Sequence, residues 1–196
     1  AASDQVMTSY VLAALAINQA NICLAESLDL KSAKESLLKE REILKSGTSM
    51  SKKEIKKHRQ YAAGASEEIR KKTLASQQIG PDQQKAFILG ASTYLFGTYK
   101  TYQIKEDGET LIEVVEKDAK GAKSSGFSLG GALDMATKGG DYVEATNTLN
   151  LVLKGMPKHL PKLVTTAQFF IEYANSQDLE LDKDATEEFN SVSDWG

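Results

Sequence analysis

Apolar side chains recur in this sequence at the spacing of an α-helix. Between Val6 and Leu28 the apolar and small residues lie three or four positions apart, which puts them on one face of a long amphipathic helix. Comparable stripes follow over 32–44, 52–79, 82–105, 141–155 and 161–175. No stretch alternates apolar and polar residues between turn signals as a half-buried strand does. The spacing therefore predicts an all-α fold, a bundle of about six to eight helices.

Two of the expected helix starts carry a capping box. Ser32 is followed three residues later by Glu35, and Ser51 is followed in the same way by Glu54. In this motif the serine hydroxyl and the glutamate carboxylate each accept a hydrogen bond from a backbone N–H that the first turn leaves unpaired. We therefore expect one helix to begin at each serine.

Glycine and proline residues mark the expected helix ends. Asp107–Gly108 is typical of a turn, and a short helix is expected after it. We expect Gly155 to end one helix, and Pro157 and Pro161 to bound the start of the next. From about residue 177 the chain is acidic, so we expect a polar C-terminal tail with a single helical turn.

The composition fits one soluble helical domain over residues 1–196. Apolar residues make up 41% and charged residues 26% of the chain, both near the averages for globular proteins. A formal net charge of −3 excludes an overall field that would attract nucleic acid. Cys23 is the only cysteine, which excludes an internal disulfide; its helical, apolar surroundings favour a structural thiol.

The segment 82–105 is apolar on most sides, which is typical of a helix enclosed by others. Gly90 and Gly97 lie seven residues apart within it, on one face. Glycine costs about 1 kcal/mol relative to alanine inside a helix, so the pair indicates a local purpose. One purpose is close approach of a neighbouring helix, and the other is room for a bound apolar or amphiphilic molecule. For the second interpretation, the candidate ligand-binding residues are Phe87, Gly90, Tyr94, Gly97, Phe170 and Tyr173.

One motif has the form of a catalytic site. Gly126–Gly130 reads Gly-Phe-Ser-Leu-Gly and resembles the nucleophile elbow of the α/β-hydrolases. The resemblance implies Ser128 as nucleophile, with Asp134 or Asp141 as acid and His159 as base. The elbow follows a buried parallel strand, which is a nearly continuous apolar run. The eight residues before Gly126 are small or charged, so the sequence predicts that the protein is not an enzyme, with a serine hydrolase as the remote alternative.

Metal-binding patterns are also missing from the sequence. His58 and His159 are isolated, and neither His-Glu-x-x-His nor Cys-x-x-Cys occurs. A carboxylate-bridged di-iron bundle would need Glu-x-x-His, which the chain lacks. We therefore predict no metal site and no cofactor.

Basic residues crowd one part of the chain. Lys52, Lys53, Lys56, Lys57 and Arg59 fall within two turns of an expected helix that has only a thin apolar stripe. This face could contact an anionic partner such as lipid headgroups or an acidic protein surface. The alternative is a solvated helix face whose field is partly offset by the acidic tail.

The remaining expectations concern location and function. No run reaches the ~18 apolar residues of a membrane span, so we expect a protein that does not cross the membrane. The opening Ala1-Ala2-Ser3-Asp4 fits a periplasmic or secreted protein after removal of a signal peptide, with a cytoplasmic protein as the alternative. The leading interpretation is a non-catalytic bundle that binds a protein partner or a small apolar or amphiphilic ligand. A scaffold acting through the basic face, without a pocket, is the alternative.

Overall fold

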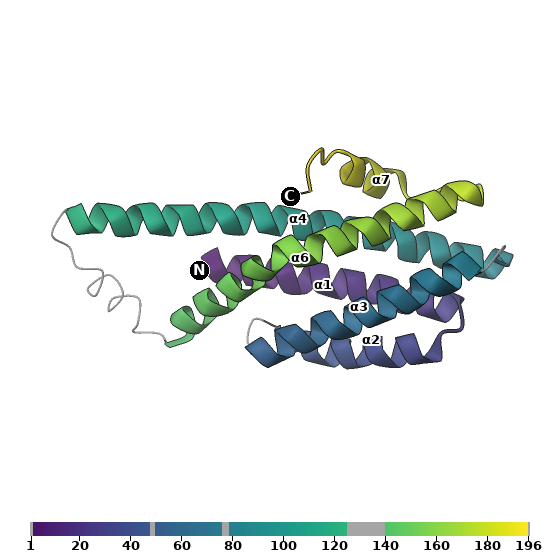
Figure 1. The fold of residues 1–196 in the computed structure, drawn as a ribbon, viewed down its shortest axis with the longest axis horizontal. Coiled ribbons are helices and arrows are strands. Elements are labelled where there is room, and N and C mark those ends of the chain that lie inside the picture. The colour runs from purple at the N-terminus through teal and green to yellow at the C-terminus, as the bar shows by residue number, and fades with distance from the viewer. Residues whose placement is uncertain (1, 48–49, 76–78, 125–139, 196) are drawn as a thin grey trace.

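The chain folds into an elongated bundle of helices (Figure 1). The structure, a computed structural model, describes residues 2–47, 50–75, 79–124 and 140–195. Within these ranges it contains helices and no strand, which confirms the all-helical prediction. The helices are α1 (Ala2–Ser27), α2 (Lys31–Leu44), α3 (Lys52–Ala75), α4 (Pro81–Ser124), α6 (Gly140–Ser176) and α7 (Lys183–Asn190).

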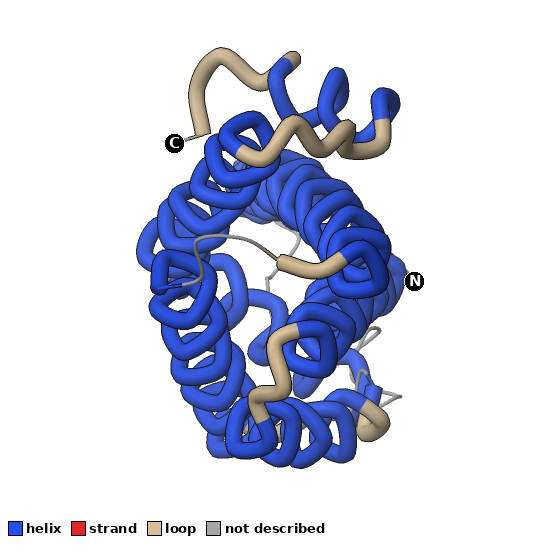
Figure 2. Tube along the Cα trace, turned by 90° about the vertical axis from the view of Figure 1, so that its right-hand side faces the viewer, coloured by secondary structure: helices blue, strands red, loops and turns tan. Residues whose placement is uncertain are grey.

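Helices α1 and α4 form the central pair of the bundle. Helices α2 and α3 pack against α1 on one side, α6 crosses the pair, and α7 lies on the outside of α4 (Figures 1 and 2). The expectation that 82–105 is central is met, because α4 contacts α1, α6 and α7.

The two glycines of α4 allow its close contact with α1. A Cβ atom at Gly90 would lie 2.7 Å from Leu24 Cγ and 3.1 Å from the carbonyl oxygen of Ala20. A Cβ atom at Gly97 would lie 2.6 Å from Ile17 Cγ1. Both distances to side-chain carbon are far below ordinary van der Waals contact. Close helix approach is thus the purpose that the structure supports, and α1 leaves no room for a ligand beside either glycine.

Two expected helix ends are wrong, and both errors have the same cause. Helix α4 runs straight through Gly108, where a Cβ atom would lie 2.6 Å from Leu153 Cδ2. Helix α6 likewise runs through Gly155, Pro157 and Pro161. At Gly155 the missing side chain makes space for the guanidinium group of Arg59. These glycines serve close contacts between helices rather than helix ends.

The capping predictions have different outcomes. Ser51 Oγ accepts a hydrogen bond from the Glu54 N–H at 3.3 Å, and Glu54 Oε2 accepts one from the Ser51 N–H at 2.7 Å. That box is confirmed. The box at Ser32 is wrong, because α2 begins one residue earlier, with Leu30 as N-cap and no side-chain cap.

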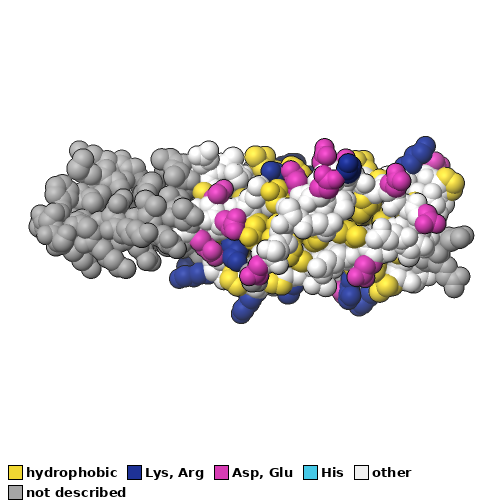
Figure 3. Space-filling model, turned by 90° about the horizontal axis from the view of Figure 1, so that it is seen from above, with side chains coloured by type: hydrophobic (Ala, Val, Ile, Leu, Met, Phe, Trp, Pro, Cys, Tyr) yellow, Lys and Arg dark blue, Asp and Glu magenta, His cyan; other side chains and the backbone are white. Residues whose placement is uncertain are grey.

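The C-terminal segment differs from the expected polar tail. The carboxylate of Asp182 accepts a hydrogen bond from the Ala185 N–H at 2.9 Å and so caps the eight-residue helix α7. Phe189 is buried, and Trp195 packs on Tyr102 of α4 with ring centroids 5.3 Å apart. Acidic side chains are prominent on the surface above α4 and α7 (Figure 3). The segment is therefore acidic outside and apolar against the bundle.

Helix α1 is long and apolar enough to cross a membrane, by length and composition alone. Within Gln5–Ser27 the most apolar 18-residue window has a mean hydropathy of 1.3, and 56% of that window is buried inside the protein. The core helix of a soluble protein meets the same test, as does a signal sequence, so the evidence for a span is weak. In this bundle Asn18 and Asn21 of α1 both donate hydrogen bonds to neighbouring helices. The absence of a membrane span stays a prediction.

Candidate functional site

A pocket of about 470 Å³ opens between α3 and α6, beside Tyr94 of α4. Small and apolar side chains supply most of its walls, and polar side chains lie at its floor and rim. The lining residues are Ala62, Ala63, Ser66, Glu67, Arg70, Tyr94, His159, Pro161, Lys162, Leu163, Thr165 and Thr166. The helical period explains the grouping on α3, because Ala62, Ser66 and Arg70 lie four residues apart on one face.

Three hydroxyl-bearing side chains line the pocket: Ser66 of α3, Tyr94 of α4 and Thr166 of α6. Behind Ser66, Asn21 Nδ2 donates to Ser66 Oγ at 3.3 Å. Burial raises the pKa of Tyr94 to about 12, although the neighbouring Thr166 and Ser66 act in the opposite direction. The phenol therefore stays protonated at neutral pH.

The rim of the pocket carries charged groups. Arg70 donates from Nε and Nη2 to the Glu67 carboxylate, at 3.2 and 3.0 Å. This hydrogen bond from Arg70 lowers the pKa of Glu67. Lys71 lies 3.7 Å from the same carboxylate. Lys162 is exposed and forms no ion pair within the described part of the chain. The rim thus combines a satisfied ion pair with one extra positive charge.

His159 lies in the pocket wall as a neutral imidazole. Burial, together with the positive charges of Arg59 and Lys162, lowers its pKa to about 3. At neutral pH this ring contributes hydrogen-bonding nitrogens and an aromatic surface, but no charge.

A second polar cluster lies beneath this region and is closed to solvent. The Tyr10 hydroxyl is 2.8 Å from His58 Nε2, and His58 Nδ1 is 3.3 Å from Glu40 Oε1. Asn18 Nδ2 donates to Glu40 Oε2 at 2.8 Å. Each of these four side chains is at most 2% exposed. None of them lines the pocket, so the cluster joins α1, α2 and α3 as a structural element.

Arg59 connects that cluster to α6. Its guanidinium group donates to the backbone carbonyl of Val152 at 3.2 Å. Burial raises the pKa of Tyr10, and the positive charge of Arg59 acts in the opposite direction. Its Nε atom is buried with no hydrogen-bond partner among the described residues. The sequence had suggested that Arg59 belongs to an exposed basic face, and the structure shows that it does not.

The other four basic residues of that face do lie on the surface. Lys52, Lys53, Lys56 and Lys57 are all exposed on the first turns of α3. None of them forms an ion pair with a residue that the structure describes. These four lysines therefore form a basic surface patch, and a partner for this patch stays a prediction.

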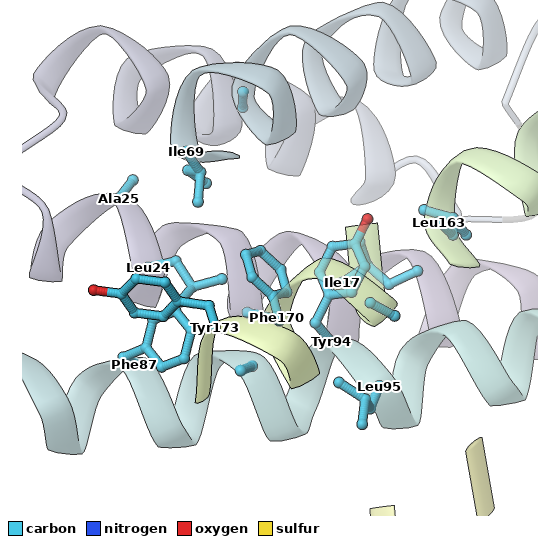
Figure 4. Close-up of a cluster of buried hydrophobic side chains, with 14 of the residues drawn as sticks. Ile17, Leu24, Ala25, Ile69, Phe87, Tyr94, Leu95, Leu163, Phe170 and Tyr173 are labelled. Atoms are coloured by element: carbon cyan, nitrogen blue, oxygen red, sulfur yellow. The ribbon is translucent and has the colours of Figure 1, made fainter. Parts of the chain in front are cut away.

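The structure separates the sequence-predicted ligand residues into two groups. Phe87, Phe170 and Tyr173 form a packed aromatic cluster, with ring centroids of Phe87 and Tyr173 5.1 Å apart (Figure 4). Tyr94 packs edge-on against Phe170 at 5.2 Å, but its hydroxyl reaches the α3–α6 pocket. Of the six predicted residues, Tyr94 is the one that lines this pocket.

Sequence reasoning missed the rest of the pocket. Ser66, Thr166 and His159 come from two helices that are about 100 residues apart in the chain, so no local motif joins them. One signal was available: the apolar stripe of α3 is unusually thin, with small residues at 62, 63 and 66. A stripe of small residues leaves space beside a neighbouring helix.

The hydrolase motif gains no geometric support. Ser128 and Asp134 lie outside the described residues. Asp141 falls in α6, but its side chain is not described, and His159 faces the α3–α6 pocket. No group of three or more His, Cys, Asp or Glu side chains among the described residues could hold a metal ion.

A second hollow of about 410 Å³ lies between α1 and α4 on another face. It is lined in part by Leu12, Ala16 and Phe96, and the Leu12 side chain is 61% exposed. Unlike the α3–α6 pocket, it is not lined by a buried tyrosine. A substitution in this hollow is therefore a suitable control for a substitution in the α3–α6 pocket.

The fold and the pocket together define a helical bundle with a cavity between two of its packed helices, α3 and α6. No protein-family model, curated protein or solved structure matches this chain.

Proposed function

We propose that this protein is a non-catalytic helical-bundle protein that binds a small, largely apolar ligand in the α3–α6 pocket. The observation that carries the proposal is the combination of mostly apolar walls with three hydroxyl groups in one pocket, that of the buried Tyr94 and those of the partly exposed Ser66 and Thr166. Ligand sites typically have mostly apolar walls and a few placed polar groups that fix orientation. The volume of about 470 Å³ also falls in the usual range for such sites.

The titratable groups of the pocket favour binding over catalysis. An efficient general acid or base has a pKa near the working pH. Burial instead lowers the pKa of His159 to about 3 and raises that of Tyr94 to about 12. Neither group exchanges protons readily at neutral pH, so a role in positioning a ligand fits both better.

A fluorescence titration with 2-naphthol tests this proposal. The probe has an apolar ring system and one hydroxyl group, which matches the walls and floor of the pocket. We expect saturable binding to the wild-type protein, and loss of that binding in Ala63→Phe, which places a ring in the pocket. The matched control is Ala16→Phe, which places the same ring in the α1–α4 hollow.

The two variants separate the possible results. Binding that Ala63→Phe removes and Ala16→Phe preserves supports the α3–α6 pocket. Binding that responds only to Ala16→Phe, or that neither variant affects, overturns the proposal. Native mass spectrometry of freshly purified protein is an independent test, and we expect an added mass that Ala63→Phe abolishes.

A second candidate function follows from the four exposed lysines of α3. Four cations without ion-pair partners among the described residues favour association with an anionic surface. We expect the protein to sediment with phosphatidylglycerol vesicles at low salt and to be released at high salt. A variant with Lys52, Lys53, Lys56 and Lys57 all changed to Glu that sediments equally well would contradict this candidate.

A further inference from the structure

The lining of the α3–α6 pocket carries more positive than negative charge. Arg70 of α3 and Lys162 of α6 line it from its two walls, and Glu67 supplies the one carboxylate among the lining residues that the structure describes. His159 is neutral at neutral pH, so two positive side chains stand against one negative one, a net charge of +1. The pocket lining is therefore short of one negative charge.

The ion pair at the rim leaves donors unused. Arg70 donates to the Glu67 carboxylate from Nε at 3.2 Å and from Nη2 at 3.0 Å. A guanidinium group has five N–H donors, and the two on Nη1 of Arg70 bond no residue that the structure describes. Lys71 lies 3.7 Å from the same carboxylate, so Glu67 already serves two cations. On the other wall, Lys162 is exposed and without an ion-pair partner among the described residues.

A third positive charge lies close to the pocket wall and also lacks a counter-charge. The pKa of His159 is lowered by burial and, in addition, by the positive charges of Arg59 and Lys162. Arg59 Nε is buried and has no hydrogen-bond partner in the described part of the chain. The buried carboxylate of Glu40 belongs to the closed polar cluster and forms no ion pair with Arg59. The surroundings of the pocket thus add to its positive charge.

This charge distribution discriminates between possible polar groups on a ligand. An ammonium group beside His159 would meet the same repulsion that disfavours the protonated ring. A neutral group would leave the excess positive charge of the lining uncompensated. A carboxylate accepts hydrogen bonds from ammonium and guanidinium groups, and such charge-assisted bonds are stronger than neutral ones. Its single negative charge also equals the missing charge of the lining.

From the charges that line the pocket we infer that its ligand is a small amphiphile with one anionic group, a carboxylate. The carboxylate binds at the rim, to Lys162 of α6 and to the free Nη1 edge of Arg70 of α3. The apolar body lies deeper, against Ala62 and Leu163. This inference rests on the proposed function and adds the chemical class of the ligand to it.

The test compares three probes that share one ring system: 2-naphthoate, 2-naphthol and protonated 2-naphthylmethylamine. In fluorescence titrations at low salt and neutral pH, we expect 2-naphthoate to bind about threefold to tenfold more tightly than 2-naphthol. The ammonium probe should bind most weakly. Because the rim is open to solvent, the advantage of 2-naphthoate should shrink in about 1 M salt, which screens exposed charge pairs.

Lys162→Gln tests whether the charge at the rim causes this preference. We expect the ratio of 2-naphthoate to 2-naphthol affinities to fall toward one, with the affinity for 2-naphthol unchanged. The matched control is Lys154→Gln, which removes the same charge from an exposed lysine of α6 that does not line the pocket. Lys154 lies about 12 Å along the helix from Lys162, farther than the Debye length of about 10 Å at 0.1 M salt. The control should leave the ratio unchanged.

Glu67→Gln should have the opposite effect. The substitution removes the carboxylate that Arg70 and Lys71 share, so the free donors of Arg70 increase and the lining loses its negative charge. We expect 2-naphthoate to bind about threefold more tightly to this variant than to the wild type, and 2-naphthol to bind equally to both. A merely structural role of Glu67 would weaken the binding of both probes. Circular dichroism checks that each variant folds.

The outcomes distinguish the two proposals. If 2-naphthol or the ammonium probe binds as tightly as 2-naphthoate, and Ala63→Phe still blocks binding, the anion inference is overturned and the binding function stands. If no probe binds, or if Ala63→Phe leaves all binding unchanged, both are overturned. A preference for 2-naphthoate that persists in Lys162→Gln, or that falls equally in Lys154→Gln, also overturns the inference.

Discussion

Replacing Gly97 by alanine tests the role of the glycines in α4 through the sign of a stability change. If the glycine faced open space, alanine would stabilise the helix by about 1 kcal/mol through its better helix propensity. In the structure, the new Cβ atom would lie 2.6 Å from Ile17 Cγ1 and 3.3 Å from the backbone nitrogen of Ile17. The side chain can yield, but the backbone of α1 must shift as well.

The expected magnitude follows from the two opposing effects. Forcing an extra methyl group into a packed contact typically costs about 1–3 kcal/mol. The propensity gain of about 1 kcal/mol offsets part of that cost. We therefore expect Gly97→Ala to lower the free energy of unfolding by about 1 kcal/mol, as measured by urea denaturation. Gly90→Ala should behave similarly, because its Cβ atom would meet Leu24 and the Ala20 carbonyl oxygen.

Gly64→Ala is the matched control for this experiment. Gly64 lies inside α3, and a Cβ atom there would meet nothing within 4 Å. We expect that variant to be more stable than the wild type by about 1 kcal/mol. If Gly97→Ala is stabilised as much as Gly64→Ala, the glycine does not serve close packing and the account of the α1–α4 contact is refuted.

Three further predictions concern buried and reactive groups. Tyr10→Phe removes the buried hydroxyl that lies 2.8 Å from His58 Nε2, and should lower the free energy of unfolding by about 1–3 kcal/mol. Tyr102→Phe removes a hydroxyl whose hydrogen bond to Glu106 is exposed to solvent, and should change the free energy of unfolding by less than about 0.5 kcal/mol; equal effects would contradict the buried cluster. Because the pKa of His159 falls to about 3 on folding, the unfolded chain binds a proton that the folded chain does not between about pH 3 and 6.5. The free energy of unfolding should therefore decrease as the pH is lowered, by up to about 2 kcal/mol between pH 7 and pH 5. In urea denaturation, His159→Gln should remove the part of this decrease that His159 causes; a pH dependence equal to that of the wild type would refute the prediction. A fluorophosphonate probe should leave Ser128 unlabelled, and labelling would revive the hydrolase alternative.

The sequence predicted local features well where the cause was local. The Ser51–Glu54 capping box formed as expected, since its two partners are three residues apart and need no other part of the chain. The helical stripes also predicted the fold class, because the spacing of apolar residues determines which face each helix can bury.

Features that depend on distant contacts were not predictable in the same way. Gly108 and Gly155 have the sequence character of helix ends, yet Leu153 and Arg59 pack over them. A single sequence does not reveal which helix will cross at a glycine, so a crossing and an end look alike. The same limit applies to the pocket, because its lining residues come from α3, α4 and α6.

Tyr94 shows both sides of this limit. Its place on the central helix marked it as a candidate ligand residue, and it does line the α3–α6 pocket. The other predicted ligand residues do not line that pocket. Phe87 and Phe170 pack among themselves, and Gly90 and Gly97 contact α1.

Methyl NMR during titration with 2-naphthol tests the central claim most directly. The account predicts that the methyl signals of Ala62, Ala63 and Leu163, which line the α3–α6 pocket, shift with saturation. Signals of Leu12 and Ala16 in the α1–α4 hollow should stay in place. Shifts confined to Leu12 and Ala16, or no saturable shift at any of these positions, would contradict the claim that this protein binds its ligand between α3 and α6.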